Sequence, residues 1–247
     1  MSGHVRPMIA EPPVKTRVAH LAIPADLLAD AAIEDHRVFL RQASWDDFER
    51  VLAMRGEKSV PRIAYDRGII EIMSPSSHHE RIKSLIGRLV EVYCQERAID
   101  FTPFGSWTLK EAAKEAGLEP DECYIFGADS SLERPHLAIE VIWTSGGINK
   151  LDLYHRLGVA EVWIWQRARL TPYVWRDEQY QPLATSEILP DLDLRLLEGF
   201  LDGHDTTSAA MRAYRAALSQ ASADPAGDDP ASEPLSRNHL RGTRRGS

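Results

Sequence analysis

The sequence predicts one mixed α/β domain with additions at both ends, and three patterns support this prediction. Apolar residues recur at helical spacing from Ile82 to Tyr93. Two apolar runs flank Asp66-Arg-Gly68, which is typical of a β-hairpin. Residues 136–143 are apolar at nearly every position, which is typical of a strand covered on both faces within a sheet. Helices and strands therefore share one chain.

Composition and charge restrict the class of protein. A chain of 247 residues with 43% apolar and 27% charged residues can bury a proper core. Its formal net charge of -8 gives no general attraction to nucleic acid or anionic lipid. Cys94 and Cys123 form neither a disulfide framework nor a metal-binding spacing, and no apolar run is long enough to span a membrane. We expect a soluble cytoplasmic protein that does not bind membranes.

The composition divides the chain into three parts. Residues 1–43 contain several prolines and predict an arm with one short helix. Residues 44–202 hold the periodic patterns and form the main domain. Residues 203–247 predict one helix over 206–219, followed by a tail from residue 221 onward. That tail is rich in Ala, Asp, Pro, Ser and Arg, so we expect it to be disordered.

The first elements of the main domain have clear start and stop signals. Ser44 begins a helix, with Asp47 three residues later as a capping acid and Gly56 as the stop. The hairpin strands follow at residues 62–65 and 69–73. Ser74-Pro-Ser-Ser77 ends the hairpin and caps a long helix over residues 78–97.

The rest of the main domain is predicted to contain one helix and several strands. A helix that carries Lys150 ends at Gly158, and Trp163 and Trp165 alternate on a strand, where we expect core or interface residues. The charged segment 110–117 is expected to be a connection. The predicted strands are residues 101–109, 121–126, 136–143, 161–165, 173–175 and 180–183.

Two charged residues lie where the patterns predict burial. Glu140 falls inside the apolar run, and desolvating an ionised carboxylate costs several kcal/mol unless it is paired, hydrogen-bonded or bound to a metal. Lys150 heads the apolar stripe of Leu153, Tyr154 and Leu157, and in the first turn it opposes the helix dipole. Both costs are offset if Lys150 reaches back to Glu140, or to an anionic ligand that Glu140 helps to hold through a metal.

Asp121 adds a second acid to this pair. It starts a strand, and period-2 alternation places it on one face with Cys123 and Ile125. If that strand lies beside the Glu140 strand, the two carboxylates converge near Lys150. Two carboxylates and water suit Mg²⁺ or Mn²⁺. A lysine beside such an ion can orient a water molecule and balance the charge of a phosphate.

Several sequence blocks, in this order, resemble the Uma-type putative restriction endonucleases, a branch of the PD-(D/E)XK nuclease superfamily. The resemblance covers roughly residues 44–200 and rests on Tyr65-Asp-Arg-Gly68, Glu71-Ile-Met-Ser-Pro75, His79-Glu80, Glu119-Pro-Asp-Glu-Cys-Tyr124, Ala138-Ile-Glu-Val141 and Lys150-Leu with Tyr154 and Gly158-Val-Ala-Glu-Val-Trp163. It implies a restriction-endonuclease-like fold, in which helices flank a central mixed β-sheet.

The resemblance also implies a metal-dependent DNA endonuclease. Asp121 and Glu140 match the two metal-binding acids, and the backbone carbonyl of Val141 would add a ligand. Lys150 would position the attacking water or stabilise charge, and His79 would contact the substrate phosphate or assist proton transfer. Ile142 stands where the superfamily usually has its lysine, so the lysine has moved to the following helix. Cutting both strands of a duplex commonly needs two sites, so a homodimer is a further expectation. No residue in the sequence indicates where the two copies would meet.

Other interpretations stay open. The Glu140 and Lys150 pair could be a structural ion pair in a catalytically silent relative that binds DNA or protein, which Ile142 and the acidic net charge favour. A hydrolase of sugars with two carboxylates is a weaker third hypothesis, which metal dependence would exclude. His79 could bond only within its own first helical turn. Glu80 and Glu91 are expected on a solvated helix face with Lys83 and Gly87, and Glu122 is expected to point away from Asp121.

Overall fold

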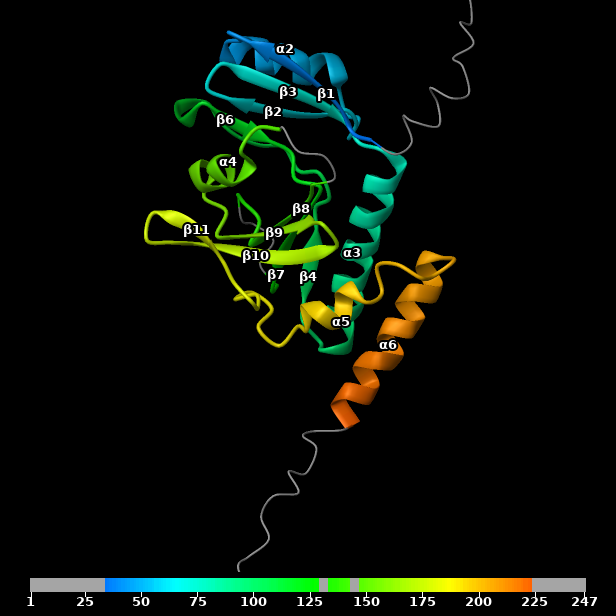
Figure 1. The fold of residues 1–247 in the computed structure, drawn as a ribbon. Helices are drawn as coiled ribbons and strands as arrows, with labels where there is room; N and C mark the ends of the chain where they lie inside the picture. The colour runs from blue at the N-terminus through cyan, green and yellow to red at the C-terminus, as the bar shows by residue number, and fades with distance from the viewer. Residues whose placement is uncertain (1–33, 129–132, 143–146, 224–247) are drawn as a thin grey trace, which may run out of the picture.

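The computed structural model describes residues 34–128, 133–142 and 147–223, and Figure 1 shows their arrangement. The short helix predicted within the arm and the predicted disorder from residue 224 onward lie outside the described residues. Two β-sheets are placed one above the other in this view, and helix α3 (Ser77–Glu96) runs along one side of them. None of the described helices is both long and apolar enough to cross a membrane.

The smaller sheet is antiparallel, with the strand order β1-β3-β2-β6-β5. Helix α2 (Trp45–Arg55) covers one of its faces, where Phe48, Ile63 and Ile70 are buried. The strands of this sheet are β1 (His36–Arg41), β2 (Arg62–Asp66), β3 (Ile69–Ser74), β5 (Leu109–Glu111) and β6 (Ala116–Leu118).

The larger sheet has the strand order β11-β10-β9-β8-β7-β4 and is mixed. Strands β8 and β9 are parallel, and the other neighbours are antiparallel. Its strands are β4 (Phe101–Pro103), β7 (Glu122–Phe126), β8 (Leu137–Val141), β9 (Glu161–Gln166), β10 (Arg169–Arg176) and β11 (Gln179–Pro182). The prediction of a mixed sheet flanked by helices is confirmed.

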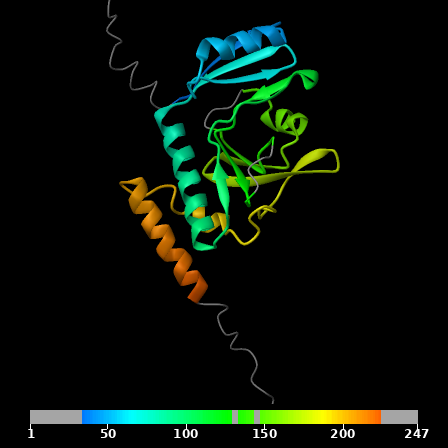
Figure 2. The ribbon, with the colours of Figure 1, turned by 180° about the vertical axis from the view of Figure 1, so that it is seen from behind.

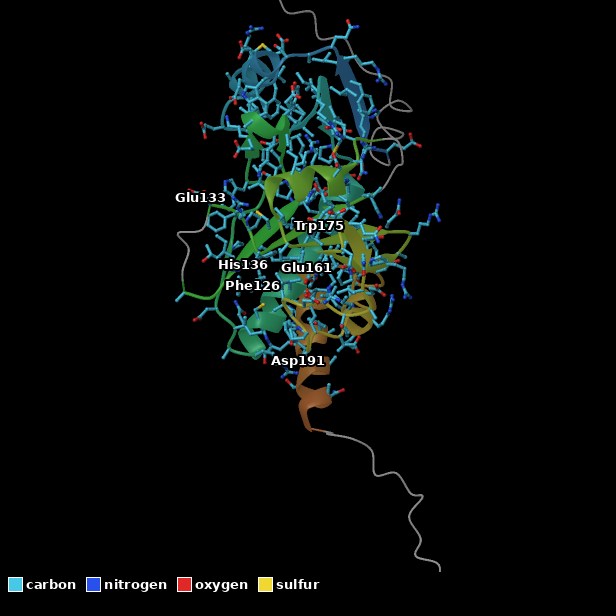
Figure 3. All side chains as sticks on the ribbon, turned by 90° about the vertical axis from the view of Figure 1, so that its left-hand side faces the viewer. Phe126, Glu133, His136, Glu161, Trp175 and Asp191 are labelled. Atoms are coloured by element: carbon cyan, nitrogen blue, oxygen red, sulfur yellow. The ribbon has the colours of Figure 1, made fainter. Side chains whose placement is uncertain are left out.

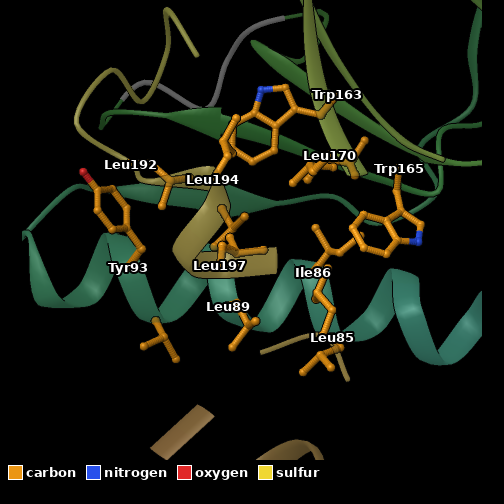
Figure 4. Close-up of a cluster of buried hydrophobic side chains, with 14 of the residues drawn as sticks. Leu85, Ile86, Leu89, Tyr93, Trp163, Trp165, Leu170, Leu192, Leu194 and Leu197 are labelled. Atoms are coloured by element: carbon orange, nitrogen blue, oxygen red, sulfur yellow. The ribbon is translucent and has the colours of Figure 1, made fainter. Parts of the chain in front are cut away.

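The main core lies between α3 and the larger sheet. Leu85, Ile86 and Leu89 of α3 share one buried cluster with Trp163 and Trp165, and Figure 4 shows Ile86 pointing toward Trp165. The predicted apolar stripe and the core role of both tryptophans are confirmed. Helix α5 (Leu194–Glu198) closes this core, and α6 (Thr207–Ala223) lies beside α3 in both ribbon views (Figure 2).

Helix α4 (Lys150–Leu157) lies between the two sheets. Its buried side chains Leu153 and Tyr154 belong to a second apolar cluster, which joins Leu118 of the smaller sheet to Ala138 and Val162 of the larger one. The helix ends as predicted at Gly158, which has a φ of 75°. Strand β8 and helix α4 therefore present their charged residues where the sheets meet.

Local signals were accurate in the first half of the domain. Ser44 and Asp47 form the predicted reciprocal cap of α2, with Asp47 N–H donating to Ser44 Oγ at 3.2 Å and Ser44 N–H to Asp47 Oδ2 at 2.9 Å. The hairpin of β2 and β3 is present, and Ser76 caps α3.

Strand β7 also contacts the start of β8, where Phe126 N–H donates to His136 Nδ1 at 3.0 Å (Figure 3).

The structure corrects four of the predicted segments. The single strand predicted over residues 101–109 is wrong: β4 and β5 belong to different sheets, because Pro103 has no N–H to continue the ladder and Gly105 turns the chain with a φ of 55°. The predicted charged connection holds the end of β5, a 3₁₀ turn (Ala112–Lys114) and β6. The predicted arm contains β1, and the C-terminal helix continues past its predicted end at residue 219 to Ala223.

Candidate active site

The two predicted acids lie on neighbouring strands. Strands β7 and β8 pair with Glu122 opposite Ile139, so Asp121 and Glu140 are the next residues in line. Both residues are fully buried. Val141 N–H donates to Asp121 Oδ2 at 2.7 Å, which fixes the Asp121 carboxylate at the end of the β8 strand. The prediction that these strands are neighbours is confirmed.

Lys150 reaches back to Glu140, as the sequence predicted. Its Nζ lies 2.5 Å from Glu140 Oε2, and the Tyr154 hydroxyl donates to the other carboxylate oxygen. Burial opposes the charge on Lys150, but the carboxylates of Glu140 and Asp121 raise its pKa, so the ammonium form is favoured. Burial raises the pKa of Glu140, and the nearby Asp121 adds to this effect while Lys150 opposes it.

Arg62 is a site residue that the sequence analysis missed. Its side chain is 4% exposed, and its Nε lies 2.9 Å from Asp121 Oδ1. Its Nη1 donates to the carbonyl of Pro120 at 2.9 Å, and its Nη2 to Glu80 Oε1 at 3.2 Å. Burial would raise the pKa of Asp121, yet His79, Arg62 and Lys150 hold that pKa well below its usual range. Asp121 is therefore ionised beside two cationic side chains, Arg62 and Lys150.

His79 lies between two carboxylates. Its Nε2 is 3.1 Å from Asp121 Oδ2 and its Nδ1 is 3.0 Å from Asp35 Oδ2, with all three side chains fully buried. Although burial opposes protonation, Asp121 and Asp35 raise the pKa of His79 to about 9. The backbone N–H of His79 donates to Ser76 Oγ, but the ring contacts reach well beyond its own helical turn. His79 therefore belongs to the same cluster as Asp121.

This pKa predicts how the stabilising effect of His79 depends on pH. The folded-state pKa of about 9 lies above the usual 6.5, so the contribution is fully present below about pH 6.5 and disappears as the pH rises through about 9. We expect His79→Asn to lose about 3 kcal/mol more unfolding free energy, relative to the unaltered protein, at pH 6 than at pH 10. Urea unfolding at both pH values measures this difference, and an equal loss at both contradicts the assignment.

Glu71 is a third carboxylate that the sequence analysis did not place in the site. It is 2% exposed, and its Oε2 accepts a hydrogen bond from Ile148 N–H at 2.7 Å. A Cβ added to Gly147 would lie 3.0 Å from the same oxygen, so this glycine allows the loop to approach Glu71. Glu71 thereby holds the segment that leads into Lys150, and its negative charge favours the lysine ammonium.

A cavity of about 290 Å³ opens in front of Lys150. Arg37, Asn149 and Gln166 supply polar groups to its wall, while the aliphatic part includes Val141, Ile142, Ile148, Leu151 and Ile164. A larger cavity of about 530 Å³ lies beside α2 and is lined by neither Glu140 nor Lys150. Lys150 and Glu71 line the smaller cavity, whereas the buried Asp121 and Glu140 lie behind its wall.

The donor set is compatible with a hard divalent cation. Asp121 Oδ1 accepts no hydrogen bond from the described residues, although it is completely buried and pairs with Arg62. Among the described residues, no three His, Cys, Asp or Glu side chains are grouped to enclose a metal. Two carboxylates alone match Mg²⁺, which commonly keeps several waters and binds through one or two protein carboxylates and substrate phosphates.

The face of α3 that was expected to be solvated is partly exposed at Glu80, Lys83 and Glu91. Glu80 pairs with Arg62, and Lys83 lies 3.2 Å from Glu80 and 3.6 Å from Glu122. The expectation of a solvated face is wrong for Gly87, which is buried against strand β7. A Cβ at this position would lie 2.9 Å from the Tyr124 hydroxyl. Glu122 faces Lys83, whose Nζ lies 3.6 Å from Glu122 Oε1.

Comparisons with known proteins place these residues in a family. A crystal structure of a putative nuclease belonging to DUF820 from Anabaena variabilis ATCC 29413 is similar at 16% identity and a TM-score of 0.45, over 65% of this chain and 99% of that chain. No curated protein matches. The family model described as Uma2, putative restriction endonuclease, matches residues 45–204, which is more than half of the chain. This protein therefore belongs to the Uma2 family of putative restriction endonucleases.

Proposed function

We propose that this protein is a metal-dependent DNA endonuclease that hydrolyses phosphodiester bonds. Family membership supports a nuclease function. The proposal of metal-dependent DNA cleavage rests on the contact of Lys150 Nζ with Glu140 at 2.5 Å. Glu140 lies on the strand beside Asp121, and Lys150 lies at the edge of a cavity. A lysine and two buried carboxylates combine a cation-binding set with a group that can act on a phosphate.

Asp121 and Glu140 would hold the cation, Mg²⁺ or Mn²⁺, and the backbone carbonyl of Val141 would add a ligand. A bound cation of this kind polarises a phosphoryl oxygen and lowers the pKa of water. Both acids have the hard oxygen donors that such ions prefer.

Lys150 would act on the substrate, and His79 would act on Asp121. The Lys150 ammonium would balance charge on the scissile phosphate and orient the water for in-line attack. His79 is fully buried, so we assign it a role through Asp121 in place of the direct phosphate contact that the resemblance implied. Its protonated ring would keep the Asp121 carboxylate ionised and in place.

Incubation with supercoiled plasmid DNA tests this function. We expect nicked or linear product with Mg²⁺ or Mn²⁺, and no product when EDTA is present. Single-stranded circular DNA in parallel establishes which substrate form is cut, and sedimentation of the protein tests the expected homodimer. Purified protein that neither cuts any DNA nor binds Mn²⁺ contradicts the proposal.

A second candidate function is a nuclease-fold protein that binds DNA or a protein partner without cutting. It is favoured by the ion pairs that already neutralise both acids, Arg62 with Asp121 and Lys150 with Glu140. A buried ion pair of this kind can exist for structural reasons alone. Binding of DNA with no cleavage under any metal condition supports this function over the first.

A further inference from the structure

Asp35 brings a charge into the site from outside the family match, which begins at residue 45. It lies just before β1, and its side chain is fully buried. Its Oδ1 accepts a hydrogen bond from Ser76 N–H at 2.9 Å, at the cap of α3. Its Oδ2 lies 3.0 Å from His79 Nδ1 and 3.5 Å from Arg37 Nη2. The residue therefore links β1 to the ring that contacts Asp121.

Two carboxylates, one at each ring nitrogen, fix how the His79 ring lies. Asp35 faces Nδ1 at 3.0 Å and Asp121 faces Nε2 at 3.1 Å. Turning the ring over would bring ring carbons to both carboxylates and remove both contacts. Because the three side chains are fully buried, water cannot replace a lost partner without opening the core. The position of Asp35 thus determines which nitrogen faces Asp121.

The contact between His79 Nε2 and Asp121 then determines which carboxylate oxygen of Asp121 is held. Oδ2 accepts a hydrogen bond from Val141 N–H at 2.7 Å and lies 3.1 Å from His79 Nε2 as an ion pair. Oδ1 accepts no hydrogen bond from the described residues and faces Arg62 Nε at 2.9 Å. A carboxylate fixed through one oxygen can present the other one to a ligand.

We propose that Asp35 is a positioning residue of the active site, which acts through His79 to hold the Asp121 carboxylate by Oδ2, so that Oδ1 can bind a divalent cation in place of Arg62. The cation-binding part of this inference rests on the proposed function. His79 contacts the proposed ligand Asp121, and groups that contact metal ligands in this way orient them and commonly change metal affinity 10- to 100-fold when altered. Asp35 acts one contact farther away, through the His79 ring. A purely structural Asp35 would only fasten β1 to the start of α3.

The first test uses the metal-free full-length chain. Asp35→Asn keeps the size of the side chain and an oxygen for Ser76 N–H, so the fold is expected to persist. In nitrogen-edited NMR spectra at one fixed pH, we expect both His79 ring nitrogen resonances to move, including that of Nε2 on the far side of the ring. An Nε2 resonance identical to that of the unaltered protein overturns the positioning role.

The second test measures Mn²⁺ affinity by calorimetry on the same proteins. We expect Asp35→Asn to bind Mn²⁺ about tenfold more weakly than the unaltered protein. In a His79→Asn background the same change should have no further effect, because Asp35 acts through that ring. Equal affinities in the first comparison, or additive losses in the second, overturn the inference.

Glu161→Gln provides the matched control. Glu161 is 1% exposed and accepts hydrogen bonds from Trp163 Nε1, Ser186 Oγ and Glu187 N–H, but it pairs with Leu137 at the other end of β8 from Glu140 (Figure 3). It should lose stability and retain both the His79 resonances and Mn²⁺ affinity. If the unaltered protein binds no Mn²⁺, the proposed function fails, while the metal-free NMR comparison still decides whether Asp35 positions His79.

Discussion

We expect Lys150→Met to abolish the proposed DNA cleavage and to lower the free energy of unfolding by about 3 kcal/mol at neutral pH. The loss of activity, about 100-fold or more, follows from removing the only cation that contacts Glu140 among the described ion pairs. The loss of stability follows because the substitution leaves the buried Glu140 carboxylate without its charged partner, and only Tyr154 continues to donate to it. Methionine keeps nearly the same length, so packing changes contribute little.

The pH dependence of this loss has a definite sign. Burial already raises the pKa of Glu140, and removing Lys150 raises it further. A carboxyl group with a raised folded-state pKa protonates as the pH falls, so the cost of its unpaired charge disappears in acid. We therefore expect the difference in unfolding free energy between Lys150→Met and the unaltered protein to be largest near pH 8 and smallest near pH 4.5.

Lys83→Met is the matched control for Lys150→Met. The Lys83 side chain is 16% exposed, against 17% for Lys150. Lys83 contacts the carboxylates of Glu80 and Glu122, as Lys150 contacts that of Glu140. Those contacts lie at 3.2 and 3.6 Å on partly exposed partners, so we expect a loss below about 1 kcal/mol and normal cleavage. Urea unfolding and plasmid cleavage measure both variants. Full activity in Lys150→Met, or a stability loss that does not vary with pH, contradicts this role of Lys150.

We expect Asp121→Asn to remove the proposed cleavage and Mn²⁺ binding together, and to cost about 3 to 5 kcal/mol of stability. The stability loss arises because Arg62 and His79 both lose the charge that they face, at 2.9 and 3.1 Å, in a site where all three residues are buried. The loss of metal binding arises because an amide oxygen is a weaker ligand than a carboxylate for a hard cation.

Asp193→Asn is the control for this substitution. Asp193 caps α5 by accepting hydrogen bonds from Arg195 and Leu196 N–H, and asparagine is an equally good cap. The control should therefore retain stability, Mn²⁺ affinity and cleavage. If Asp121→Asn binds Mn²⁺ as tightly as the unaltered protein, Asp121 is not a ligand and the proposed site is wrong.

Local and periodic features of the sequence were sufficient for much of the fold. The Glu140 and Lys150 pair was predictable because burial of either charge alone is unfavourable, and the two residues are only ten apart. The cap at Ser44 and the helix end at Gly158 follow from signals within one turn. The mixed sheet was expected from the family resemblance and is present.

Contacts between distant segments were not predictable in this way. Arg62 meets Asp121 only because the two sheets pack together, and Asp35 meets His79 across 44 positions of sequence. Nothing in the local pattern around either residue marks it as buried. The separate smaller sheet was missed because β5 and β6 have three residues each, which is too short for a periodic signal.

A crystal structure of the protein soaked in Mn²⁺ tests the central claim most directly. Anomalous scattering locates the ion without any assumption about activity. The proposed function predicts an anomalous peak within bonding distance of Asp121 and Glu140, with the Lys150 ammonium beside it. A structure in which the Arg62 with Asp121 and Lys150 with Glu140 pairs persist in saturating Mn²⁺, with no peak between the two acids, contradicts it.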